Sequence, residues 1–106
     1  MASLSVPVDR EGFLRDLSDW NETVAEELAL ADDIELTAAH WEVIELVRRY
    51  YDSFAISPVM RVLVKIVGEG LGPEKGTSIY LMQLFKGRPA RYVSKIAGLP
   101  KPTNCD

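Results

Sequence analysis

The sequence contains one cysteine and one histidine among 106 residues, and these shortages exclude several kinds of site. A single cysteine cannot form an internal disulfide or a cysteine-based metal cage, and a lone histidine gives no metal-binding spacing. No stretch approaches the roughly 18 uninterrupted apolar residues of a membrane span, and the N-terminus lacks the segments of a secretory signal. We therefore expect a cytoplasmic protein without metal or other cofactor, whose cysteine stays a thiol in a reducing compartment.

Basic residues are scarce in the first half of the chain, and acidic residues are scarce in the second. Residues 1–53 contain 13 acidic and 4 basic side chains, whereas residues 54–106 contain 3 acidic and 8 basic ones. Because summed charge steers encounters, the basic second half favours an anionic partner, either a protein or an RNA. Ordinary solvated helix faces would give the same counts, so that alternative stays open.

Apolar side chains recur at three- and four-residue steps after residue 18, and no segment there alternates with a period of two. Capping residues and breaks at Gly and Pro then predict five helices. Their expected ranges are 22–31 after an Asn21 cap, 38–54 after a Thr37 cap, 58–69 after a Ser57 cap, a shorter helix through 79–85 opened by Gly76-Thr77-Ser78, and 89–97. The predicted fold class is mainly α, a compact bundle of crossed helices after a short N-terminal extended segment.

Two prolines after Gly98 prevent the last helix from continuing, so we expect a helical domain over residues 1–97 and a flexible C-terminal arm over residues 98–106. Cys105 lies near the end of this arm, and the eight residues that separate it from Ala97 can span about 26 Å. A free thiol has a pKa near 8.5, and the neighbouring Asp106 carboxylate should raise that pKa further. The arm would therefore be a poor catalyst by itself, which fits a carrier activated by partner enzymes better than an independent enzyme.

Other motifs favour structural roles. His40 in the first turn of the 38–54 helix indicates local hydrogen bonding, and the glycine run 68–73 indicates a helix end, because a phosphate loop should open a helix. The acidic pairs, Asp32 with Asp33 and Glu42 with Glu45, are expected to be solvated.

Two other functions stay open. The helix pair 38–54 and 58–69 is compatible with a helix-turn-helix regulator in which Arg61 and Lys65 approach phosphate, although the first helix is acidic. A plain interaction module with an incidental thiol is the other alternative.

Several segments resemble the family that joins the sulfur-relay protein TusE to DsrC, the gamma subunit of dissimilatory sulfite reductase. The likeness covers nearly the whole chain. The segments that carry it are Val8–Leu14, Leu36–Ile44, Ser57–Lys65, Leu84-Phe85, and Ile96–Pro102 before the penultimate Cys105.

The resemblance implies that Cys105 accepts a sulfane sulfur as a persulfide and relays it. DsrC-type members carry a second cysteine eleven positions earlier, where this chain has Ser94, so the chain is similar to the one-cysteine TusE-type branch. The implied partners are a sulfur-donating sulfurtransferase complex and an acceptor, either a thiouridylase with its tRNA or a sulfite reductase-type enzyme of dissimilatory sulfur metabolism. We expect four basic residues to steer such partners: Arg88, Arg91, Lys95 and Lys101.

Overall fold

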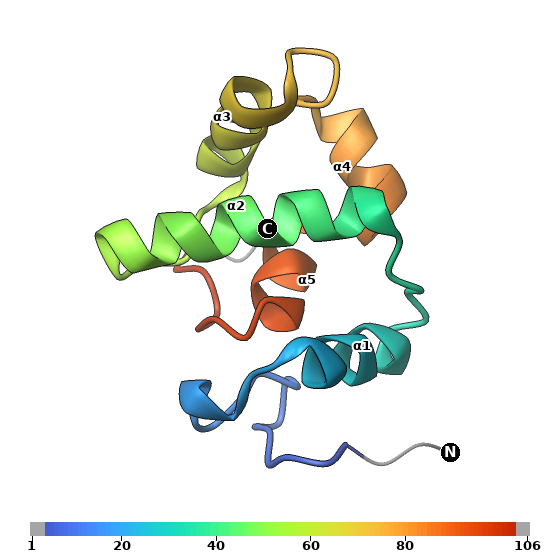
Figure 1. The fold of residues 1–106 in the computed structure, drawn as a ribbon, viewed down its shortest axis with the longest axis vertical. Helices are drawn as coiled ribbons and strands as arrows, with labels where there is room; N and C mark the ends of the chain where they lie inside the picture. Colours follow the sequence, from blue (N-terminus) through green and yellow to red (C-terminus); the bar gives the residue numbers. More distant parts are fainter. Residues whose placement is uncertain (1–3, 104–106) are drawn as a thin grey trace.

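A computed structural model describes residues 4–103 of the chain, and Figure 1 shows their arrangement. Within these residues a short 3-10 helix, η1, precedes five α-helices. The elements are η1 (Leu17–Asp19), α1 (Glu22–Ala31), α2 (Ala38–Phe54), α3 (Met60–Leu71), α4 (Ser78–Phe85) and α5 (Pro89–Ile96). The predicted mainly α fold class is confirmed, and four of the five expected helices agree with the observed ranges to within one residue.

Helix α5 is the centre of the bundle, because it packs against each of the other four α-helices. The long helix α2 crosses above it, and α1 lies on its opposite side (Figure 1). The side chains of α5 are accordingly the most completely enclosed: Ala90, Val93, Ser94 and Ile96 have no exposed surface. The residues that follow α5 therefore start in the middle of the core.

Capping explains why the helices begin where the sequence predicts. Asn21 Oδ1 accepts a hydrogen bond from the Val24 N–H at 2.8 Å, which satisfies an otherwise unpaired donor at the start of α1. At the start of α2, the Nδ1 atom of buried His40 accepts from the Thr37 N–H at 3.1 Å, and its Nε2–H donates to the Leu84 carbonyl at 2.8 Å. The local hydrogen-bonding role predicted for His40 is confirmed.

Helix α3 differs from its predicted range. It begins at Met60 instead of residue 58, Val59 is its N-cap, and no side chain caps it. Ser57, which we predicted as the cap, is buried and uses its hydroxyl elsewhere. At the other end, Gly72 has a φ of +111° and terminates the helix, as expected from the glycine run.

The N-terminal extended segment folds back on itself through one antiparallel bridge between Val8 and Leu14. The turn between them is closed by the Asp9 N–H, which donates to the Phe13 carbonyl at 2.8 Å, and Gly12 occupies it with a φ of +91°. Phe13 is only 2% exposed, so the turn is anchored in the core.

None of the helices in residues 4–103 is long and apolar enough to cross a membrane.

Candidate functional site at the root of the C-terminal arm

Cys105, the predicted nucleophile, lies outside the described residues. The site is therefore built from the residues that lead to it, Ala97–Pro102, which we call the arm root. In Figure 1 the arm root leaves α5 and runs below the C-terminal half of α2. Leu99 and Pro102 are buried, so this part of the arm lies against the domain. The boundary at residue 97 and the flexibility of the arm stay predictions.

The end of α5 is a Schellman motif, in which a left-handed glycine turns the chain out of the helix. Gly98 has a φ of +75°, its N–H donates to the Lys95 carbonyl at 3.0 Å, and the Leu99 N–H donates to the Ser94 carbonyl at 2.9 Å. The motif satisfies carbonyls that the helix end would leave unpaired, and it fixes the direction in which the arm departs.

Two side chains bind the last carbonyls of α5 from outside. Trp20 Nε1–H donates to the Ile96 carbonyl at 2.8 Å, and Arg48 Nη1 donates to the Ala97 carbonyl at 2.6 Å. The Arg48 guanidinium also lies 3.7 Å from the centroid of the Trp20 ring, a close cation–π contact. Partial burial lowers the pKa of Arg48, although the neighbouring Asp52 carboxylate opposes this effect.

Trp20 also explains the glycine at position 98. A Cβ atom at this position would lie 2.6 Å from Trp20 Cγ and 2.8 Å from Trp20 Cβ, so the indole occupies the space of a side chain. The glycine is therefore required by both its backbone conformation and the close approach of the ring.

Ser57 holds the arm root at Pro100. Its Oγ–H donates to the Pro100 carbonyl at 2.5 Å, and the serine is 4% exposed. The contact connects the α2–α3 loop with the arm.

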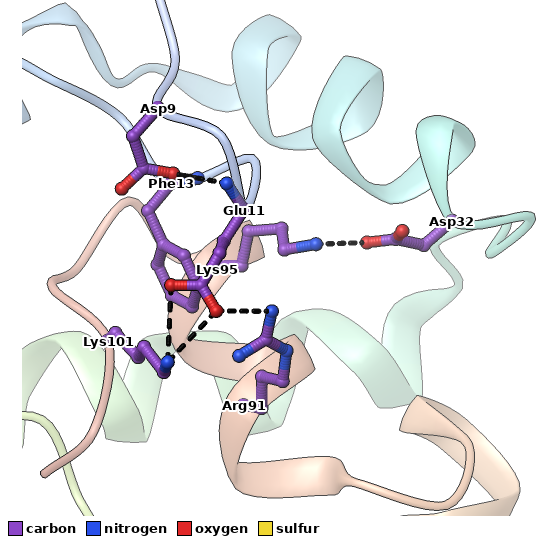
Figure 2. A network of polar contacts seen from close by, with 7 residues as sticks. All are labelled: Asp9, Glu11, Phe13, Asp32, Arg91, Lys95 and Lys101. Carbon is purple, nitrogen blue, oxygen red and sulfur yellow. Dashed lines mark hydrogen bonds and ion pairs between the residues drawn. The ribbon is translucent and has the colours of Figure 1, made fainter. Parts of the chain in front are cut away.

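Glu11 binds the arm root through its carboxylate, as Figure 2 shows. Lys101 Nζ lies 2.9 Å from Glu11 Oε2 and 3.1 Å from Oε1, and Arg91 Nη2 donates to Oε2 at 3.2 Å. The hydrogen bond from Lys101, reinforced by Arg91, lowers the pKa of Glu11 below its ordinary value. A single carboxylate thus joins the N-terminal turn, α5 and the arm.

Lys95 lies on the same side of α5 but is directed toward α1 (Figure 2). Its Nζ donates to Asp32 Oδ2 at 3.0 Å, only 8% of the residue is exposed, and the ammonium lies 5.4 Å from the Tyr92 ring and 5.8 Å from the Phe13 ring. The interpretation of Asp32 as a solvated carboxylate is wrong, because it is the partner of a buried lysine.

The four expected steering residues are thus not equivalent. Arg91 and Lys101 meet at Glu11, Lys95 is enclosed at Asp32, and Arg88 is exposed at the start of α5. Steering by these residues stays a prediction. Arg91 and Lys101 share a structural partner, Glu11, beside the arm.

Ser94, where the resemblance implies a second cysteine in DsrC-type proteins, is completely buried in α5. Within residues 4–103 its Oγ has no hydrogen-bond partner. Its carbonyl accepts the Leu99 N–H in the Schellman motif, so the backbone of Ser94 takes part in the turn that begins the arm.

A surface hollow of about 290 Å³ is lined in part by Trp20 and Arg48. Its lining also includes Trp41, Ile44 and Glu45 of α2.

No three His, Cys, Asp or Glu side chains among residues 4–103 are grouped to hold a metal ion.

Sequence reasoning missed Glu11, Trp20, Arg48 and Ser57 as residues of this site. They lie between 43 and 90 positions along the chain from the residues that they bind, so no local spacing connects them with the arm root. The available signal was the Ile96–Pro102 segment itself, whose Gly and Pro residues indicate a fixed backbone path that other side chains must accommodate.

A family model described as "DsrC like protein" matches residues 1–105 of this chain. The chain belongs to this DsrC-like family. Among curated DsrC-like relatives, the "Sulfurtransferase TusE" of Photorhabdus laumondii is 47% identical over 100 residues, which cover 94% of this chain and 90% of that protein. The "Sulfurtransferase TusE homolog" of Haemophilus influenzae is 47% identical over 102 residues, covering 96% and 94% of the two chains.

Solved structures of DsrC share the fold. The NMR structure of Allochromatium vinosum DsrC is similar with a TM-score of 0.84 and 49% identity, over 93% of this chain and 88% of that one. The crystal structure of the oxidized gamma subunit of dissimilatory sulfite reductase (DsrC) from Archaeoglobus fulgidus gives a TM-score of 0.82 and 39% identity, over 95% and 92%. The helical bundle described above is therefore the fold of the DsrC-like family.

Proposed function

We propose that this protein is a sulfur carrier that holds sulfane sulfur as a persulfide on Cys105 and delivers it to an acceptor protein. The observation that carries the proposal is the match of 94% of the chain to a relative named sulfurtransferase TusE, with the Ile96–Pro102 segment present before a penultimate cysteine. Cys105 is also the chain's only thiol, so no other residue can carry the sulfur in this way.

The proposed chemistry needs no external oxidant or reductant. The Cys105 thiolate attacks the outer sulfur of a donor's cysteine persulfide, a new S–S bond forms on Cys105, and the donor's S–S bond breaks to release its thiolate. Because the attacking group is a thiolate, a partner pocket that stabilises negative charge would accelerate the step.

The arrangement of the arm root supports a carrier in preference to a free-standing enzyme. The Trp20, Arg48 and Ser57 side chains direct their hydrogen-bond donors to backbone carbonyls of α5 and the arm. They fix where the arm leaves the domain, and the reacting surface is left to a partner. Arg88, Arg91, Lys95 and Lys101 are proposed to guide that partner to the basic side of the chain.

The proposed partners follow the relatives. A sulfurtransferase complex would supply sulfur and a thiouridylase with its tRNA would consume it, and the proposed location is the cytoplasm. A sulfite reductase-type partner is the alternative, because the similar structures include the gamma subunit of dissimilatory sulfite reductase.

The first test is intact-protein mass spectrometry after incubation with polysulfide or a persulfidated donor. Wild-type protein should gain about 32 Da per sulfur in a form that a thiol reductant removes, and Cys105→Ser should gain nothing. Thr103→Ser is the matched control, because it alters an exposed residue of the same arm and leaves the thiol in place. Sulfur loading of folded Cys105→Ser, or no loading of wild type when a control thiol carrier is loaded, would refute the proposal.

A second measurement addresses the acceptor. In cells that lack the gene, the 2-thiolated wobble uridine of tRNA should fall, and wild type but not Cys105→Ser should restore it. Unchanged thiolation would favour the sulfite reductase-type alternative.

A further inference from the structure

The arm root is held by two kinds of contact. Up to Ala97 the backbone is fixed by Trp20 and Arg48, which bind carbonyls at the very end of α5. Beyond Gly98, the contacts that depend on polar side chains include the Ser57 hydrogen bond to Pro100 and the Glu11 ion pair with Lys101. The second group, together with the burial of Leu99 and Pro102, keeps this part of the arm on the domain.

Glu11 lies in a turn whose conformation is fixed by contacts that do not involve the arm. Asp9 Oδ1 accepts from the N–H groups of Glu11 and Phe13, both at 2.9 Å, and Phe13 is buried in the core (Figure 2). Arg91 of α5 binds the same carboxylate and limits its rotation. The carboxylate is therefore positioned before Lys101 arrives, which reduces the entropy lost when the ion pair forms.

The length of chain that this contact controls is large. Cys105 is three residues beyond Pro102 and eight residues beyond Ala97. An extended chain advances about 3.3 Å per residue, so Cys105 can reach about 10 Å from a docked Pro102 but about 26 Å from Ala97.

We infer that Glu11 is a positioning residue of this carrier, which clamps Lys101 and holds the arm root in a short-reach state. Breaking the Glu11–Lys101 ion pair favours states of longer reach, in which the arm is held no further than the Ser57 contact with Pro100 or, when that contact also opens, only at the end of α5. The inference rests on the proposed function for its purpose, but the clamp itself is a property of the folded chain and can be measured without any sulfur chemistry.

The experiment uses the single thiol as the attachment point of a probe. A fluorescent maleimide on Cys105 reports local motion of the arm through its anisotropy, and ¹⁵N relaxation of the Lys101 amide reports the arm root directly. Glu11→Gln keeps the size of the side chain and removes its charge, so the anisotropy should fall and the amide should become more mobile. For an exposed ion pair, the ratio of docked to released arm should change by up to about fivefold.

Glu42→Gln is the matched control. Glu42 pairs with Lys75 at 3.2 Å, and the exposed fractions of the two side chains, 45% and 35%, nearly equal those of Glu11 and Lys101, 42% and 35%. It should leave the arm signals unchanged. Lys101→Arg should behave as wild type, and Lys101→Gln should also mobilise the arm, with an effect in the double variant smaller than the sum of the two single effects.

The salt dependence of arm mobility separates an electrostatic clamp from a merely structural role of Glu11, because salt screens the ion pair. Raising the ionic strength from about 0.01 M to about 1 M should mobilise the wild-type arm and have little effect on Glu11→Gln. Equal arm mobility in wild type and Glu11→Gln, or an equal effect of Glu42→Gln, would overturn the inference. Polysulfide loading of wild type and Cys105→Ser tests the proposed function separately, because it depends on the thiol and does not report on the clamp.

Discussion

Replacement of Gly98 by alanine should destabilise the whole domain, although the change adds one methyl group. Alanine in the left-handed conformation costs about 1–2 kcal/mol. The new Cβ would also lie 2.6 Å from Trp20 Cγ, so the indole must move. Its displacement weakens the hydrogen bond to the Ile96 carbonyl and the Arg48 cation–π contact, each with a net contribution of about 1 kcal/mol.

The expected loss in the free energy of unfolding is about 2–4 kcal/mol, measured by urea denaturation with an unchanged m value. For a domain of this size, the melting temperature should fall by at least about 8 °C. Gly87→Ala is the control, because a Cβ at Gly87 meets no atom within 4 Å and its backbone is not left-handed. It should change the stability by less than about 0.5 kcal/mol.

A double-mutant cycle separates the two causes. With Trp20→Gly as background, which removes the Cβ atom as well as the indole, the clash with Trp20 disappears, and Gly98→Ala should cost only the backbone share of about 1–2 kcal/mol. If Gly98→Ala is as stable as wild type, or if its cost is the same with and without the indole, then Trp20 does not constrain the start of the arm through Gly98.

Three further perturbations test separate contacts. Ser94→Ala should leave stability unchanged or raise it slightly in urea denaturation, because it removes a buried hydroxyl without a partner among the described residues; a loss above about 1 kcal/mol would contradict this. Ser57→Ala should lower stability by about 0.5–1.5 kcal/mol and increase amide exchange at Lys101, whereas the exposed Ser53→Ala should do neither. The lowered pKa of Glu11 means that its ion pairs stabilise the fold above the ordinary value of 4.5 and are lost as the pH falls through the lowered value. Anisotropy of a probe on Cys105 should therefore fall in acid below about pH 4.5, by less in Glu11→Gln than in wild type.

The sequence alone determined the helices, and it carries the prediction that Cys105 is the reacting group. Apolar spacing, the caps at Asn21 and Thr37 and the breaks at Gly and Pro are local signals, and the observed α1, α2, α4 and α5 follow them closely. The start of α3 is the exception. A Ser-Pro pair is an ordinary helix start, but Ser57 contacts the arm 43 residues later, and this tertiary hydrogen bond replaced the local cap.

Only the tertiary structure decided how the arm begins. Three contacts depend on how α1 and α2 cross α5. Glu11 of the first turn faces Lys101, Trp20 covers Gly98, and Asp32 neutralises a buried Lys95. Helical periodicity shows which face of a helix is buried but does not show which residue from elsewhere in the chain will meet it. Charge counts likewise identified a basic second half, whereas the partners of those charges were set by the folded arrangement, because ion pairs form between side chains brought together from distant positions.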